Sequence, residues 1–358
     1  MGCGSSSKGG GKVINQAVAV PLTPPYDGPQ VEYQFVNTQV GMTMKMFAFS
    51  EGSEMASSDI DSFYPALSSK MAEGYHMVDY RNIPGQTQTA FLSTTTKLPY
   101  QGIFMKRQDE PNQSFKLLIE KSSVQATRIR GGLIPLFGAV ENQGDCSHLI
   151  ASIAKHTQNG GRFVCMGTSG QMTSSGLGNM LSGKTPVCGV DLFFEIPDTP
   201  SENYVYQTVV VPLQTSTKVG FGGASSTVNC DWIGSFQGPL SQGWKLVSIF
   251  FDMSSSMNMQ SLTTSNANFN TLWMFEKPAA VVNDPTPRYE GIMIEFQFEM
   301  KVGFTGTTSS ISWEPKILEM GRNGWELATI LNSPGVQTAG FGKAALKLMM
   351  FFQRKILR

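Results

Sequence analysis

Hydrophobic and polar residues alternate along this chain in a pattern that recurs four times. The alternation predicts a first strand in each copy, at 31–36, 115–120, 204–209 and 293–298. It predicts a last strand in each copy, at 103–107, 192–196, 272–276 and 349–353. Strands with one buried and one polar face are typical of sheets that face a core on one side, so the pattern indicates a sheet-rich protein.

A short helix is predicted in the middle of each copy, just before a glycine. The clearest helix lies at 148–158, where apolar residues share one face at spacings of three and four. Because only glycine takes a positive φ without steric cost, we expect the glycine to end the helix in the left-handed conformation. These glycines are Gly74, Gly160, Gly243 and Gly324, and they are 86, 83 and 81 residues apart (160 − 74, 243 − 160, 324 − 243).

The residues after these glycines are related. Gly243-Trp244-Lys245-Leu246-Val247 matches Gly324-Trp325-Glu326-Leu327-Ala328, and 74–78 and 160–164 are weaker copies. We therefore predict an α+β fold of four tandem strand-helix-strand-strand repeats, with antiparallel-rich sheets covered by short helices. An anchor and Pro-rich spacer fill 1–30, repeats 1 and 2 fill 31–198, and repeats 3 and 4 fill 199–358. Trp244 and Trp325 are expected at equivalent buried positions.

The chain begins Met1-Gly2-Cys3-Gly4-Ser5-Ser6, which fits the M-G-x-x-x-[ST] pattern for N-myristoylation of Gly2. One myristoyl chain binds membranes only marginally, so stable residence requires a second signal. Cys3 can supply it as a palmitoylation site. We therefore expect a flexible, dually acylated anchor at the cytoplasmic face of a membrane; the family resemblance described below places it at the plasma membrane.

Composition limits the other partners. Lysine plus arginine and aspartate plus glutamate each total 27, so no basic excess is available for a phosphate backbone and no nucleic-acid partner is expected. No uninterrupted apolar run reaches the 18 to 20 or so residues that span a bilayer. The five cysteines form no C-x-x-C pair, which fits a reducing compartment.

Two features of the sequence are typical of enzymes. Residues 178–185 fit the phosphate-binding pattern G-x-x-x-x-G-K-[ST], but Pro186 follows directly and 190–196 alternates as a strand, so the required helix is not expected. His76, His148 and His156 are the only histidines, and the last two share a helix near Cys146 without the further close ligands that zinc requires. We therefore expect no catalytic residue, cofactor or metal.

The Met-Gly-Cys-Gly start, the early Glu32-Tyr33-Gln34-Phe35 strand, the Gly-Trp-x-Leu turns and the late Phe351-Phe352-Gln353-Arg354 strand together resemble the raftlin family. The resemblance implies an acylated protein of the inner plasma-membrane leaflet, associated with lipid rafts and with immune-receptor signalling and receptor uptake. It implies acylation at Gly2 and Cys3. The expected function is a membrane-anchored scaffold or adaptor that binds membrane lipids and unidentified proteins. A small-ligand or lipid-headgroup binding module and a nucleotide-binding enzyme remain as alternatives.

Overall fold

The structure, a computed structural model, describes residues 26–45, 54–89, 95–130, 140–173, 187–198, 202–220, 223–261, 263–303, 306–338 and 342–357. Gly2, Cys3 and the segment 178–185 lie outside these residues. The predictions of acylation and of an ordinary loop at 178–185 therefore stay predictions.

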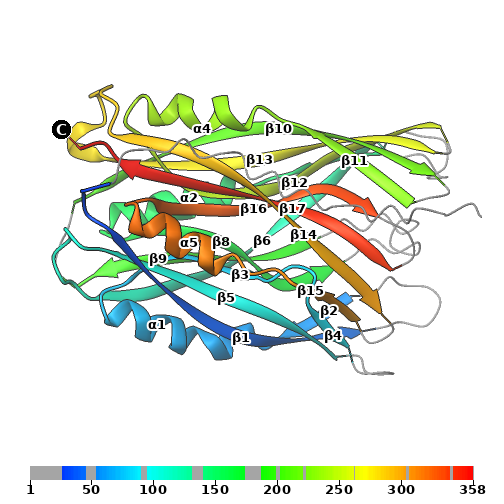
Figure 1. The fold of residues 1–358 in the computed structure, drawn as a ribbon, viewed down its shortest axis with the longest axis horizontal. Coiled ribbons are helices and arrows are strands. Elements are labelled where there is room, and N and C mark those ends of the chain that lie inside the picture. Colours follow the sequence, from blue (N-terminus) through cyan, green and yellow to red (C-terminus); the bar gives the residue numbers. More distant parts are fainter. Residues whose placement is uncertain are drawn as a thin grey trace, which may run out of the picture.

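Four successive segments share one order of elements: a long strand, a short strand, an α-helix and two further strands (Figure 1). We call them units 1 to 4. Unit 1 contains β1 (Val31–Lys45), β2 (Glu54–Ser58), α1 (Tyr64–Ala72), β3 (His76–Asn82), its short continuation β4 (Thr87–Thr89) and β5 (Thr95–Arg107). Unit 2 contains β6 (Phe115–Arg130), β7 (Val140–Gly144), α2 (Ser147–Gln158), β8 (Arg162–Thr173) and β9 (Val187–Pro197). Unit 3 contains β10 (Tyr204–Gly220), β11 (Gly223–Asn229), α4 (Trp232–Leu240), β12 (Lys245–Ser261) and β13 (Thr264–Pro278). Unit 4 contains β14 (Tyr289–Gly303), β15 (Gly306–Ser309), α5 (Glu314–Arg322), β16 (Glu326–Thr338) and β17 (Lys343–Lys355).

The strands within each unit pair in one antiparallel order. The first strand pairs with the last strand, which pairs in turn with the strand that follows the helix. The resulting triplets are β1-β5-β3, β6-β9-β8, β10-β13-β12 and β14-β17-β16.

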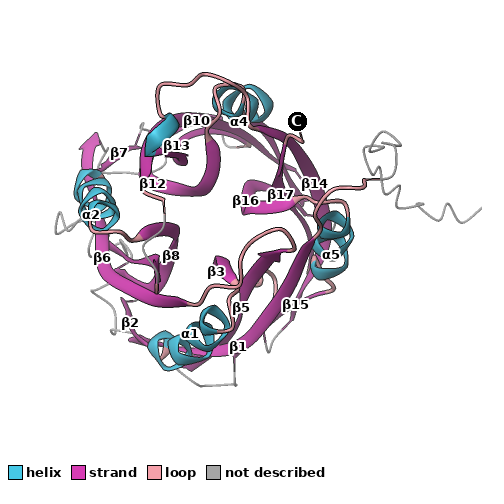
Figure 2. Cartoon of the chain, turned by 90° about the vertical axis from the view of Figure 1, so that its left-hand side faces the viewer, coloured by secondary structure: helices cyan, strands magenta, loops and turns pink. Residues whose placement is uncertain are grey.

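The short strands connect the units into a closed ring. Each one pairs with the inner strand of the next unit: β2 with β8, β7 with β12, β11 with β16, and β15 with β4, which returns from unit 4 to unit 1. Each helix also contacts the next unit, at its first strand: α1 packs on β6, α2 on β10, α4 on β14 and α5 on β1. Figure 2 shows the helices outside the ring and β3, β8, β12 and β16 around its centre.

The predicted α+β class is wrong, because the fold is mostly antiparallel sheet. The α-helices of the described residues are only 9 to 12 residues long, and none of them combines the length and apolar character required to cross a membrane. The strands are much longer than the alternation indicated. Serine- and threonine-rich stretches that resemble loops continue them, as in β10, where 214–218 pairs on both sides. A nine-residue helix spans about 14 Å, so it covers only part of a strand of this length.

Each hydrophobic core is shared by two neighbouring units. The core between units 4 and 1 combines Val31 and Tyr33 of β1 with Trp313, Ile317 and Trp325 around α5. Three further cores join units 1 and 2, units 2 and 3, and units 3 and 4 in the same way. The ring is therefore held by burial at its four seams, whereas the predicted division of the chain at residue 198 stays a prediction.

Candidate functional site

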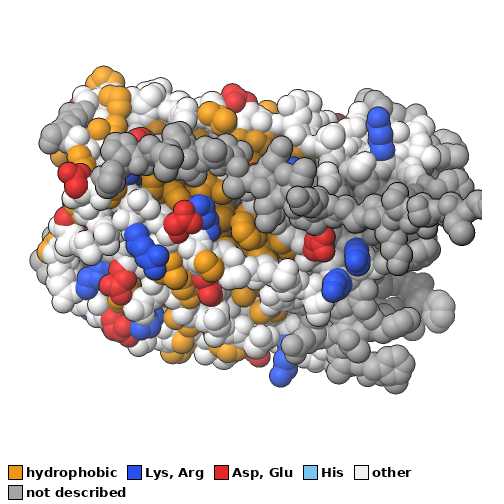
Figure 3. Space-filling view, in the orientation of Figure 1, with side chains coloured by type: hydrophobic (Ala, Val, Ile, Leu, Met, Phe, Trp, Pro, Cys, Tyr) orange, Lys and Arg blue, Asp and Glu red, His pale blue; other side chains and the backbone are white. Residues whose placement is uncertain are grey.

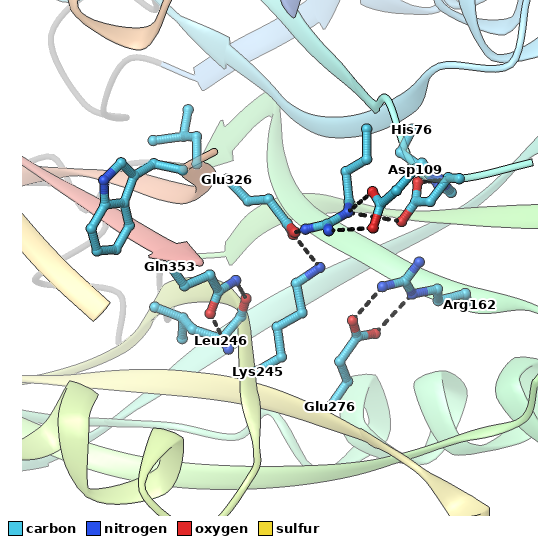
Figure 4. Close-up of polar contacts among 12 residues, drawn as sticks. His76, Asp109, Arg162, Lys245, Leu246, Glu276, Glu326 and Gln353 are labelled. Carbon is cyan, nitrogen blue, oxygen red and sulfur yellow. Dashed lines mark hydrogen bonds and ion pairs between the residues drawn. The ribbon is translucent and has the colours of Figure 1, made fainter. Parts of the chain in front are cut away.

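The inner strand of every unit begins with an ionisable residue. His76, Arg162, Lys245 and Glu326 open β3, β8, β12 and β16. Each lies two residues after Gly74, Gly160, Gly243 or Gly324, whose φ values of 88°, 86°, 81° and 73° confirm the predicted left-handed glycines. Because the inner strands begin at equivalent places around the ring, the four side chains converge near its centre (Figure 4).

A small cavity of about 50 Å³ lies where these strands begin. Three of the four opening residues line it, together with Glu195 of β9 and Glu276 of β13. Apolar residues of the inner strands complete the lining, among them Val78, Val164, Val247 and Ala328. About 10 to 15 Å³ holds one water molecule, so the cavity has room for a few waters or one small polar group.

Buried carboxylates bridge the cations on one side of the cavity. The Glu195 carboxylate lies 3.0 Å from His76 Nδ1 and accepts a hydrogen bond of 3.2 Å from Arg162 Nη1. Arg162 also donates to Glu276, from Nε at 3.0 Å and from Nη2 at 2.5 Å. Both carboxylates come from last strands and are almost completely buried. The paired geometry is that of a bidentate guanidinium contact, which is strong and directional.

Glu326 organises the other side of the cavity. Its Oε1 accepts a hydrogen bond of 2.5 Å from Arg107 Nη1, and its Oε2 lies 2.6 Å from Lys245 Nζ. Glu110 connects the two sides, because its carboxylate lies 3.2 Å from His76 Nε2 and 3.7 Å from Arg107 Nε. The charges therefore form an almost continuous chain around the ring.

Burial and ion pairing act in opposite directions on the pKa values of these groups. Burial lowers the pKa of His76, but the negative charge of Glu195 and hydrogen bonds to Glu110 and Glu195 outweigh it and raise the pKa to about 9. Burial raises the pKa of Glu195, but His76 and then Arg162 lower it to about 2. Burial likewise raises the pKa of Glu326, and Lys245 and Arg107 lower it to about 2. These groups are therefore charged at neutral pH.

Aromatic rings of the following unit cover the cations. The His76 ring lies 4.4 Å from the ring of Phe115, the Arg162 guanidinium lies 4.5 Å from the ring of Tyr204, and Lys245 Nζ lies 5.9 Å from the ring of Tyr289. These aromatic residues open β6, β10 and β14. Unit 1 follows the acidic Glu326 around the ring, and the residue that opens its first strand, β1, is Val31. A cation is attracted to the face of an aromatic ring and an anion is not, so the change of side chain fits the change of charge.

The charged groups of the cavity are mostly paired with one another. Each carboxylate of the cavity already contacts a cation, and no group of three His, Cys, Asp or Glu side chains within the described residues could hold a metal ion. Among the described residues, Lys245 Nζ contacts one carboxylate, that of Glu326. An ammonium group has three N–H donors, so Lys245 can still donate to water or to a small ligand.

The residues singled out by sequence lie in different places. Of the three histidines, His76 alone reaches the cavity, because His148 Nε2 contacts the Ser123 backbone oxygen at 2.8 Å and His156 contacts Glu120 on the outside. Trp325 is buried, with 7% of its surface exposed, under the guanidinium of Arg354 at 4.4 Å. Trp244 holds the equivalent position after Gly243 but is only partly buried, so the prediction that both tryptophans are buried is wrong for Trp244.

The cluster of charged side chains at the centre of the ring was not predicted from the sequence, although the glycine motifs share a pattern that relates to it. The third residue of each glycine motif is ionisable in all four copies. In the observed register Arg162 pairs with Glu195, Lys245 with Glu276, and Glu326 with Gln353. The motif gave no indication that positions about 80 residues apart meet at one point, because only closure of the ring brings them together.

Comparisons with known proteins find raftlins. Over 223 residues, 62% of this chain, the sequence is 25% identical to raftlin from Gallus gallus, and the match covers 35% of that protein. Over 169 residues, 46% of this chain, it is 25% identical to raftlin from Mus musculus and covers 28% of that protein. The chain thus spans about a third of the length of the curated relatives it matches. No family model and no solved structure matches. The predicted resemblance is confirmed: the chain is similar to raftlins, at low identity.

Proposed function

We propose that this protein is a membrane-anchored scaffold or adaptor at the inner leaflet of the plasma membrane. Gly2 carries a myristoyl group and Cys3 a palmitoyl group, and the folded ring presents its surface to other proteins in membrane-proximal signalling or receptor uptake. The observation that carries this proposal is the acylation pattern at the start of a chain that is similar to raftlins. The name of those relatives favours association with lipid rafts.

The distribution of charge favours the acyl chains as the source of membrane attachment. On the face shown in Figure 3, basic and acidic side chains of the described residues are interspersed. A surface of mixed sign attracts anionic lipid only weakly, because the attraction of each cation is offset by a nearby anion. This face of the ring is therefore expected to add little to membrane binding.

Fractionation of cells that express the full chain tests this proposal. Gly2→Ala removes the acylated amine and is expected to release the protein from membranes. Cys3→Ser leaves one chain and is expected to give weak, reversible association. Ser5→Ala changes a neighbouring position at which the pattern accepts any residue, and this control is expected to stay on membranes. A Gly2→Ala protein that still pellets with membranes overturns the proposal.

The cavity favours a second candidate function, the binding of a small polar ligand. Lys245 supplies spare N–H donors to the cavity, and the cavity has room for one small group. Titration calorimetry with inorganic phosphate tests it, with Lys245→Met as the variant and the surface residue Lys347→Met as the control. Heat of binding that is lost with Lys245→Met and kept with Lys347→Met supports this candidate, and no heat with the wild type rejects it.

A further inference from the structure

The backbone pairing of the short strands does not by itself distinguish one neighbouring unit from another. Within the described residues, the short strands pair across the four seams at one to three positions each: two for β2 with β8, three for β7 with β12, one for β11 with β16, and two for β15 with β4. Such short ladders contribute few hydrogen bonds and have no residue specificity. Where the chain does not connect two units, the choice of neighbour therefore depends on side chains.

At three seams the residue that opens the inner strand is a cation, and the next unit supplies the carboxylate that it contacts. At the seam of units 1 and 2, the cation His76 contacts Glu195 of the next unit at 3.0 Å. At the seam of units 2 and 3, Arg162 contacts Glu276 at 2.5 Å. At the seam of units 3 and 4, Lys245 contacts Glu326 at 2.6 Å.

The polarity is reversed at the seam of units 4 and 1. Here the opening residue of the inner strand is the acid Glu326, and the next unit supplies the cation Arg107, at 2.5 Å. Both side chains are buried, at 2% and 7% exposure. This seam also differs in covalent structure, because the chain connects the other three seams directly through 108–114, 198–203 and 279–288 and does not connect unit 4 to unit 1.

We propose that Glu326 and Arg107 form a charge-specific latch that keeps unit 4 on unit 1 of the same chain. Arg107 also donates to Asp109, two residues further along the chain, at 2.9 Å. If unit 1 docked on unit 1, 2 or 3, Arg107 would lose Glu326 and face the cation His76, Arg162 or Lys245 in its place, which is unfavourable for a buried charge. The latch accordingly selects the single order in which four units close.

Opening this seam exposes a surface that unit 4 of a second copy of the same chain can bury again. The seam buries Val31 and Ile103 of unit 1 against Trp313 and Ile317 of unit 4. Tyr33 adds backbone contacts, because its hydroxyl donates to the Trp325 oxygen at 3.0 Å and accepts from the Leu327 N–H at 2.6 Å. An open ring can bury these surfaces again by exchanging unit 4 between chains, which is domain swapping.

The test uses the full chain with Glu326→Lys, which places a cation between Arg107 and Lys245, and Glu326→Gln, a milder change that preserves side-chain shape. Glu295→Lys is the matched control, because Glu295 of the same unit pairs with Lys347 at 2.6 Å on the surface. Hydrogen exchange of the backbone amides and light scattering after size-exclusion chromatography, at several protein concentrations, are the readouts.

We expect exchange in β5 and β16 to become about 100-fold faster or more in Glu326→Lys and less so in Glu326→Gln, with β10 and β13 little changed. Dimers or larger species are expected to increase with concentration in both variants and not in Glu295→Lys. Equal acceleration in all four units, or variants that remain monomeric with unchanged exchange, overturns the proposal.

Discussion

The stability of this protein is expected to fall between neutral and mildly alkaline pH because of one buried histidine. His76 lies between Glu195 and Glu110, at 3.0 and 3.2 Å, and these contacts raise its pKa from 6.5 in the unfolded chain to about 9 in the fold. A group whose pKa is raised by folding stabilises the fold fully below its unfolded pKa. That contribution is lost as the pH rises through the folded pKa.

The size of this contribution follows from the pKa difference. About 2.5 pH units at about 1.4 kcal/mol per unit give about 3 kcal/mol, present below pH 6.5 and lost by about pH 9.5. This is a large part of the stability of an ordinary domain. Glu195 does not reverse the effect, because its pKa of about 2 leaves it ionised throughout this range.

Urea unfolding at pH 6.5, 7.5, 8.5 and 9.5 measures this loss. His76→Gln keeps a hydrogen-bonding side chain and cannot titrate, so its unfolding free energy should lack the decline of about 3 kcal/mol that the wild type shows. His148→Gln is the control, because His148 lies on the surface of α2 and contacts a backbone oxygen. If the wild type and His76→Gln follow parallel pH profiles, the assignment of a charged, ion-paired His76 is refuted.

The remaining predictions concern the glycine motifs and the untested loop. Trp325→Ala should lower the free energy of unfolding by about 3 to 5 kcal/mol and Trp244→Ala by less, since Trp244 is only half-buried; equal losses in denaturant unfolding contradict this. Gly324→Ala should lower the melting temperature more than Gly160→Ala, because a Cβ at Gly324 lies 2.2 Å from a tyrosine ring whereas none of the described atoms lies within 4 Å at Gly160. Lys184→Ala should change neither stability nor nucleotide affinity, and micromolar ATP binding that this variant loses would restore the enzyme alternative.

Local features of this fold could be predicted from the sequence because their causes are local. A left-handed residue after a helix requires glycine, and the observed positive φ of Gly74 and Gly243 follows from that steric rule. The helical face of 148–158 has the same kind of origin, because Leu149 and Ile153 lie four residues apart and both are buried.

Strand length and ring closure could not be predicted in this way. The polar residues of 214–218 form a strand because β11 and β13 flank them, and no residue in the segment itself indicates those neighbours. The pairing of Arg107 with Glu326 joins positions separated by 219 residues. Alternation identifies a face that is buried, but it does not identify the partner that buries it.

Cores that straddle the seams have a consequence for synthesis on the ribosome. The Tyr33 hydroxyl accepts a hydrogen bond from a backbone amide 294 residues later in the chain. At about 5 to 20 residues per second, β1 emerges about 15 to 60 s before α5 and β16 exist. Throughout that interval Val31 and Tyr33 lack the unit 4 residues that complete their core. The yield of closed rings is therefore expected to depend mainly on events during synthesis, such as shielding of these residues by chaperones or slower collapse of the nascent chain. The stability of the finished ring is expected to matter less.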